Sequence, residues 1–204
     1  KETQHNKLSH IAALTRIEED HYVWMDQFTI RNLELVQSTG FNGVSLLDVL
    51  DQTVSPMGAR MLRRWLVLPL KAQKSIQERL NIVDYFTHHG DSADELAIEI
   101  KKMGDLERLI SKVATARICP REVVQLKRAL NAIVPIVESC SASKNKSLVK
   151  LASQLNPCDA IREKIAKQLQ DDAPVQLMKG NVIAFGVSKE LDELRAISTS
   201  AKAY

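Results

Sequence analysis

Three arginines close together in the sequence are the residues best placed to do chemistry. Arg60, Arg63 and Arg64 fall within five positions, and a helix there would bring Arg60 and Arg64 to one face with Arg63 beside them. Guanidinium groups at this spacing can bind phosphates, the carboxylates of another domain, or only water. No aromatic platform is interleaved with them, so all three are weak candidates for DNA binding and the alternatives stay open.

Motifs for nucleotide, metal or catalytic chemistry are absent from the sequence. None of the 7 glycines is followed by a lysine, which excludes a P-loop. His88 and His89 are adjacent and would point about 100° apart on a helix, which disfavours a shared metal ion. The carboxylates fall in polar runs that do not predict a buried acid–base pair. We therefore expect no catalytic, cofactor-binding or metal-binding residue in this chain, and no enzyme activity.

Composition and cysteine usage indicate a protein of the cytoplasm. The chain has 3 cysteines, at positions 119, 140 and 158, and an odd number without a C-x-x-C pair argues against a disulfide framework or a zinc site. The net charge of +3 is too small to imply nucleic-acid binding by itself. No apolar run approaches the roughly 18 residues of a membrane span, so a membrane partner is not expected.

The elements that must position these residues are predicted to be helices. The sequence has only 7 glycines and 6 prolines among 204 residues, and aromatic residues make up 4%. Few turn-forming and aromatic residues, together with apolar residues at helical spacing, favour a mainly α fold, a multi-helix bundle with one or two short strands. The strands are expected at Tyr22–Met25 and within Asn181–Val187.

Serines predict where two of the first helices begin. Ser45 and Asp48 have the spacing of a capping box, in which each side chain binds the other residue's main-chain N–H. Ser55 stands before Pro56, which suits an N-cap followed by a proline at the first helical position. The apolar stripe of that second helix includes Trp65, which we expect to be buried.

Further along the chain, three signals predict other helix boundaries. Ser75 with Glu78 has capping-box spacing, and Gly104 followed by Asp105 predicts the end of one helix and the start of the next. A long helix is expected from residue 120, where Pro135 should kink or end it because proline lacks the N–H of a helical hydrogen bond.

Several longer strings resemble one known family. Residues 49–70 (VLDQTVSPMGARMLRRWLVLPL) closely resemble the core segment of the MutS family of DNA mismatch-repair proteins, and Arg31–Leu35 resembles the element just before it. The strings Gly104–Arg108, Arg117–Glu122 and Gly186–Arg195 resemble later family segments in the expected order. The resemblance runs from about residue 8 to residue 204.

This resemblance implies a helical lever, or core, domain with a mechanical role. In full-length members, an N-terminal domain recognises the mispair, a C-terminal domain binds ATP with magnesium, and two subunits encircle mismatched double-stranded DNA. The lever joins these parts and carries the clamp that crosses the duplex. The mispair-reading Phe-x-Glu element and the ATP loop are both missing here, so no catalytic or mispair-contacting residue is carried over.

The resemblance divides the chain into three expected parts. Residues 1–25 would lead in from a preceding connector region, residues 26–187 would form the lever, and residues 188–204 would start the helix toward the clamp. We expect a piece of a longer protein, because the chain starts with Lys1 and ends inside a helical pattern at Tyr204.

The expected function is non-catalytic coupling of the ATP state to the clamp and to mismatch recognition. The partners would be mismatched DNA, a second subunit and other domains of the same protein, whose ATP and magnesium would bind outside this chain. An independent helical adaptor that binds a protein partner is the alternative.

Overall fold

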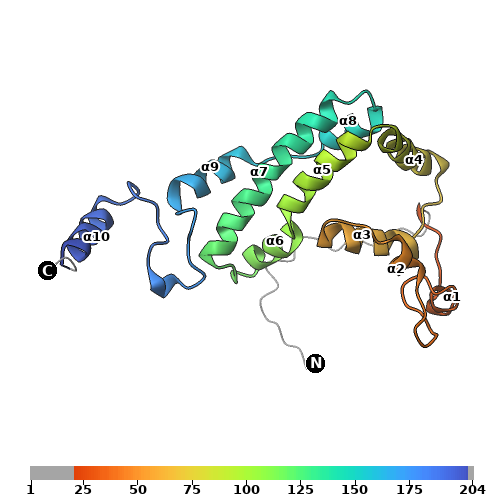
Figure 1. Ribbon diagram of the computed structural model, residues 1–204, viewed down its shortest axis with the longest axis horizontal. Coiled ribbons are helices and arrows are strands. Elements are labelled where there is room, and N and C mark those ends of the chain that lie inside the picture. The colour runs from red at the N-terminus through yellow and green to blue at the C-terminus, as the bar shows by residue number, and fades with distance from the viewer. Residues whose placement is uncertain (1–20, 202–204) are drawn as a thin grey trace.

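The chain is almost entirely helical. The computed structural model describes residues 21–201, so the predicted lead-in segment lies mostly outside the described residues. Figure 1 shows α1 to α4 toward one end of the molecule, α5 to α9 in the middle and α10 at the other end. The elements are α1 (Gln27–Asn32), α2 (Leu46–Leu50), α3 (Pro56–Val67), α4 (Gln73–His88), α5 (Gly90–Met103), α6 (Leu106–Ala114), α7 (Pro120–Ala142), α8 (Lys146–Ala152), α9 (Asp159–Gln168), the short 3₁₀ helix η2 (Leu177–Lys179) and α10 (Lys189–Ala201).

Single β-bridges stand where strands were predicted. Tyr22 pairs with Leu70 and Leu169 pairs with Ile183, both antiparallel. In residues 21–201 neither bridge extends into a strand. Leu70 lies in the short connection between α3 and α4, and Leu169 directly follows α9, so the chain has no length there for a ladder. The mainly α prediction is confirmed, whereas the short strands do not form.

Helix α7 is the spine of the fold. Its 23 residues extend about 34 Å at 1.5 Å per residue, and α5, α6, α8 and α9 pack against it. Its buried residues are Val124, Leu126, Ala129, Leu130, Ala132, Ile133, Ile136 and Cys140. The helix therefore buries side chains along most of its length, which makes it the element that ties its neighbours together.

Pro135 lies inside α7 without ending it. The helix continues for seven residues beyond the proline, to Ala142. Ile133 and Ile136 on either side of it are both buried in the core, so tertiary packing continues the helix past a residue that could have ended it. The kink at Pro135 stays a prediction.

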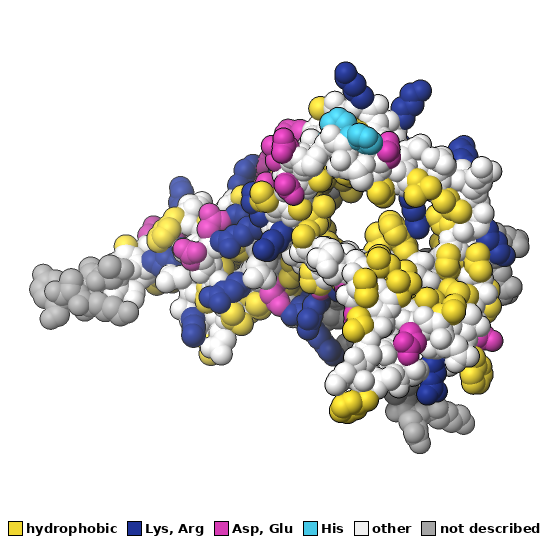
Figure 2. All heavy atoms as spheres, turned by 45° about the vertical axis from the view of Figure 1, so that its right-hand side comes forward, with side chains coloured by type: hydrophobic (Ala, Val, Ile, Leu, Met, Phe, Trp, Pro, Cys, Tyr) yellow, Lys and Arg dark blue, Asp and Glu magenta, His cyan; other side chains and the backbone are white. Residues whose placement is uncertain are grey.

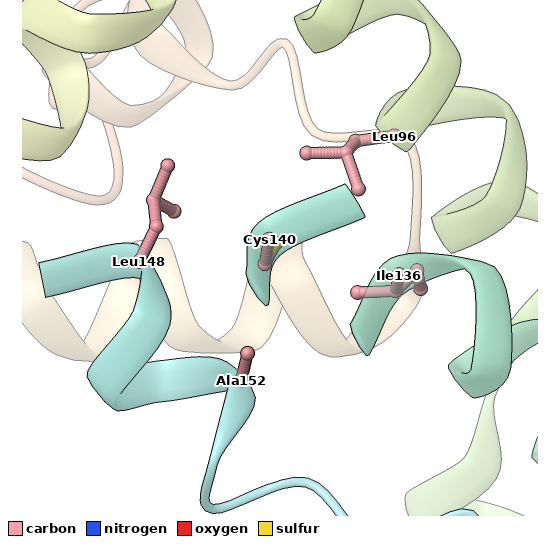
Figure 3. Close-up of a cluster of buried hydrophobic side chains, with 5 residues drawn as sticks. All are labelled: Leu96, Ile136, Cys140, Leu148 and Ala152. Carbon is pink, nitrogen blue, oxygen red and sulfur yellow. The ribbon is translucent and has the colours of Figure 1, made fainter. Parts of the chain in front are cut away.

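Two hydrophobic clusters lie along α7. In the first, Leu96 from α5 and two residues of α8, Leu148 and Ala152, gather around Ile136 and Cys140 of α7 (Figure 3). The second cluster joins α7 to α6 and consists of Leu126, Leu130 and Ile133, with Leu106 and Leu109 packed against them. Burial of these apolar side chains is the main force that holds α5 to α8 together.

An apolar groove runs beside the first cluster. The loop before α3 forms one wall of the groove, and side chains of α4, α5, α7 and α8 form the other. Leu96, Ile136, Cys140 and Leu148 line it, so the first cluster is also its floor. Figure 2 shows hydrophobic side chains edging an opening on this side of the molecule.

Most of the predicted helix boundaries are confirmed. The Ser45 hydroxyl accepts a hydrogen bond from the main-chain N–H of Asp48 at 3.2 Å, and the Asp48 carboxylate accepts one from the N–H of Ser45 at 3.0 Å. Gly104 ends α5 with a φ of 65°, and Asp105 caps α6. The boundary predicted from Ser75 is wrong, because α4 begins two residues earlier, at Gln73, without a side-chain cap.

Helix α3 begins as predicted but is poorly buried. The Ser55 hydroxyl accepts a hydrogen bond from the N–H of Gly58 at 3.1 Å, directly before Pro56. No residue of α3 is buried. Trp65, expected in the core, is 41% exposed, and the guanidinium carbon of Arg79 lies 3.7 Å from its ring centroid. The spacing of the apolar stripe thus predicted the helix correctly, but it did not predict how little of the stripe other elements would cover.

Removing the Trp65 side chain should therefore cost less than removing a core tryptophan. We expect Trp65→Ala to lower the free energy of unfolding by about 1–2 kcal/mol, below the roughly 3–5 kcal/mol typical of full burial. Urea denaturation followed by circular dichroism measures this difference. Arg79→Met keeps an aliphatic stem and removes the charge, so it measures the cation–π contribution separately from the packing of the ring. A loss of 3 kcal/mol or more in Trp65→Ala would mean that the ring is buried.

Candidate functional site

The main polar link between α3 and the helices packed on α7 is made by Arg60. Its guanidinium donates to both carboxylate oxygens of Asp105, at 2.7 and 3.0 Å, and to the Glu107 carboxylate at 2.6 and 3.0 Å. Asp105 caps α6 and Glu107 lies in its first turn. One guanidinium fork is therefore shared by two carboxylates at the start of α6, a contact that we call the Arg60 latch.

The latch shifts the pKa values of Asp105 and Arg60. Hydrogen bonds from Arg60 hold the pKa of Asp105 below its ordinary value of 3.8, and the two carboxylates raise the pKa of Arg60. Because folding lowers the pKa of Asp105, its stabilising contribution is fully present above about pH 4 and is lost as the pH falls through the lowered value. The latch should therefore stay closed at neutral pH and open only in acid.

The other two arginines of α3 are not part of the latch. Arg63 and Arg64 are exposed, and neither side chain forms an ion pair with another residue in the part of the chain that the structure describes. Of the three candidates, Arg60 thus pairs with carboxylates of α6, inside the same expected domain and not in another domain as the sequence had suggested. A DNA contact through α3 depends on Arg63 and Arg64, and this stays a prediction.

Helix α3 is attached to its neighbours near both ends. Arg60, in its second turn, reaches α6, and Trp65, near its end, stacks under Arg79 of α4. Both contacts are charged groups at a partly exposed surface, and no residue of α3 is buried. Polar contacts of this kind can be replaced by hydrogen bonds to water, whereas the contacts of an apolar core cannot be replaced by water without a large cost. The geometry therefore suits an element that changes its position as a rigid unit.

Sequence reasoning found the Asp105 cap but missed its second role. Asp105 lies 45 residues from Arg60 and Glu107 lies 47 residues away, so no helix-spacing rule connects them. The only local signal was two carboxylates at the start of a helix, which the helix dipole already explains. Pairing across this distance becomes visible only when the fold brings α3 beside α6.

The adjacent histidines and the cysteines occupy ordinary structural positions. Nδ1 of His88 and Nδ1 of His89 each lie 2.8 Å from a main-chain oxygen one turn earlier in α4. Cys140 is buried, and Cys119 and Cys158 are half-buried free thiols. Within residues 21–201, no group of three or more His, Cys, Asp or Glu side chains could hold a metal ion.

The residues present do not fit the ATP that the resemblance implies for full-length proteins. No glycine-rich loop precedes any lysine in the sequence, and such a loop is what cradles the phosphates in a P-loop. The helices in residues 21–201 are also too short or too polar to span a membrane.

Most of the chain matches one protein family and several proteins of the same name. Residues 28–203 match the family model described as MutS domain III. The DNA mismatch repair protein MutS of Parabacteroides distasonis is 55% identical over 203 residues. The proteins of the same name from Bacteroides thetaiotaomicron and Flavobacterium johnsoniae are 53% and 52% identical. The matches cover 99–100% of this chain but 23% of each relative, so the chain spans less than a quarter of their length.

Proposed function

We propose that this chain, which belongs to the MutS family and matches its domain III, is a lever. It would couple the ATP state of the whole protein to its DNA clamp. The chain itself would perform no chemistry. Its relatives are named for DNA mismatch repair, and a part that covers 23% of their length can serve that activity by transmitting motion. Family membership favours this reading over the independent adaptor.

The observation that carries the proposal is the contrast between α7 and α3. Helix α7 is long and buried along its length, with four helices packed on it, and packed helices of this kind move as units because close-packed interfaces resist gradual deformation. Helix α3 has no buried residue and is tied to α6 through the Arg60 latch. A rigid spine with an exchangeable polar attachment is what a mechanical coupler requires.

The partners follow from the same premise. We infer that the whole protein binds mismatched double-stranded DNA as a dimer and binds ATP with magnesium in another domain, in the cytoplasm. Arg63 and Arg64 would be available to contact a phosphate, since neither forms an ion pair with another described residue. We keep the division into residues 1–25, 26–187 and 188–204, in which α10 begins the helix toward the clamp.

A chimera tests the coupling. This chain would replace the matching segment of the Parabacteroides distasonis relative, to which it is 55% identical, and Arg60→Glu would then be introduced. We expect mismatch binding without nucleotide and the basal ATPase rate to stay within about twofold of the unmodified chimera. ATP-triggered release from mismatched DNA should slow at least about fivefold, the range of typical allosteric coupling.

The matched control is Lys167→Glu, which makes the same charge change in an exposed pair with Glu163 at 3.5 Å. It should leave release unchanged. Unchanged release in Arg60→Glu would refute the coupling role, and loss of basal ATP hydrolysis would point to a catalytic one. The isolated chain should hydrolyse no ATP and bind DNA weakly; a robust rate in the purified chain, absent from a mock purification, would contradict the proposal.

A further inference from the structure

The positive charge of the chain is concentrated in one segment. Residues 99–128, from the end of α5 to the middle of α7, hold eight Lys and Arg against four Asp and Glu, a net charge of +4, while the whole chain carries +3. Figure 2 shows Lys and Arg side chains gathered to the left of the opening, toward the side where α6 and α7 lie in Figure 1. The remaining 174 residues are therefore net negative by one charge.

The acidic residues of this segment are already paired. Asp105 and Glu107 bind Arg60 from outside the segment. Glu122 binds Lys112, and Glu99 binds Lys102 at 2.6 Å. No carboxylate of the segment is left over to neutralise its arginines, although one of its lysines, Lys127, is paired with Asp171 from outside the segment.

Arginines make up much of that surplus. Arg108, Arg117 and Arg121 are exposed, and their side chains form no ion pair with another residue in the range 21–201. Arg128 donates to the main-chain oxygen of Asp171 at 3.1 Å. Guanidinium groups bind carboxylates or phosphates through two parallel hydrogen bonds, so a row of them is a site for a partner with several negative charges.

Two of these arginines, Arg108 and Arg128, border a cleft with an apolar floor. The cleft has a volume of about 460 Å³ and lies between α5, α6 and α7, with Arg108 and Arg128 in its lining and Met103 and Leu109 among its apolar residues. Arg121 lies seven residues, or about 10 Å, before Arg128 on the same face of α7. The positive row thus extends from the cleft toward the start of α7.

We propose that this cleft docks an acidic protein segment in which carboxylates flank a large aliphatic side chain. The carboxylates would pair with Arg108, Arg121 and Arg128, and the aliphatic side chain would cover Met103 and Leu109. A nucleic-acid backbone fits less well, because a line of phosphates offers no apolar group to cover Met103 and Leu109. The complementary partner is therefore an acidic peptide that carries large aliphatic side chains.

Fluorescence anisotropy with defined probes tests the docking. The acidic probe is a labelled peptide of about four Glu-Glu-Leu repeats. The comparison probes are its Lys-Lys-Leu and Glu-Glu-Ser counterparts and a DNA duplex of about 20 base pairs. We expect the Glu-Glu-Leu peptide to bind with a Kd on the order of micromolar, the serine peptide to bind at least about fivefold more weakly, and the lysine peptide not to bind.

Charge reversal locates the site on the chain. Arg108→Glu with Arg121→Glu should weaken binding of the acidic peptide at least about tenfold, because both contacts become repulsive. Lys144→Glu with Lys146→Glu makes the same charge change at exposed positions beyond the other end of α7 and should leave the Kd within about twofold. Circular dichroism confirms that both variants are folded.

Each other outcome overturns the proposal. Equal loss in the two double variants would mean a general effect of net charge, and equal affinity for the leucine and serine peptides would mean that the apolar floor is not used. Tighter binding of the duplex, lost in Arg108→Glu with Arg121→Glu, would assign the surface to nucleic acid instead.

Discussion

Leu130→Ala should be among the most destabilising single substitutions in the chain. Leu130 is 6% exposed and belongs to the cluster that joins α7 to α6. Truncation to alanine removes three carbons from a close-packed site and leaves a cavity, which costs about 2–5 kcal/mol. Because small domains are stable by only about 5–15 kcal/mol, this is a large fraction of the total.

Urea denaturation followed by far-ultraviolet circular dichroism measures the loss. The matched control is Ile110→Ala on α6, which removes a similar side chain that is 50% exposed and should cost less than about 1.5 kcal/mol. A midpoint for Leu130→Ala equal to that of Ile110→Ala would show that α6 does not pack on α7 as described.

Arg60→Glu should release α3 from α6 without unfolding the α5 to α9 helices. The substitution replaces a shared guanidinium with a third carboxylate beside Asp105 and Glu107, so two attractions become two repulsions. Since α3 has no buried residue, the contact of Trp65 with Arg79 is the main attachment that remains near its other end. We expect hydrogen exchange in Pro56–Val67 to accelerate at least about tenfold, while exchange in α7 stays unchanged.

The control for this experiment lies on the same helix. Arg64→Glu makes the same charge change one turn later, at an exposed side chain that forms no ion pair with a described residue, and it should leave exchange in α3 nearly unaltered. Combining Arg60→Glu with Glu107→Arg should recover part of the protection. Equal acceleration in the Arg60 and Arg64 variants would show that net charge, rather than the latch, governs α3.

The helices could be predicted because their signals are local. Caps such as Ser45 and Asp105 act within one turn, and the family resemblance in residues 49–70, confirmed by the match over 28–203, rests on adjacent residues. The errors arise where tertiary packing overrides a local preference. Helix α7 does not end at Pro135, which has buried neighbours on both sides, and α4 begins before Ser75 without any capping side chain.

The candidate site could be predicted only in part. The three arginines were singled out by type, but their spacing does not say that Arg60 meets α6 while Arg63 and Arg64 do not. The exposure of Trp65 likewise depends on what lies opposite α3. Periodicity indicates which face of a helix is apolar. Which element packs on that face depends on tertiary contacts between residues far apart in the sequence.

The placement of α10 has a practical consequence for measurements in solution. Figure 1 shows this helix standing beyond α9, at the opposite end from α1 to α3. An outline of that kind diffuses more slowly than a sphere of equal mass. A sizing column calibrated with rounded standards would therefore report too high a mass even for a single copy, so light scattering is the appropriate way to count copies.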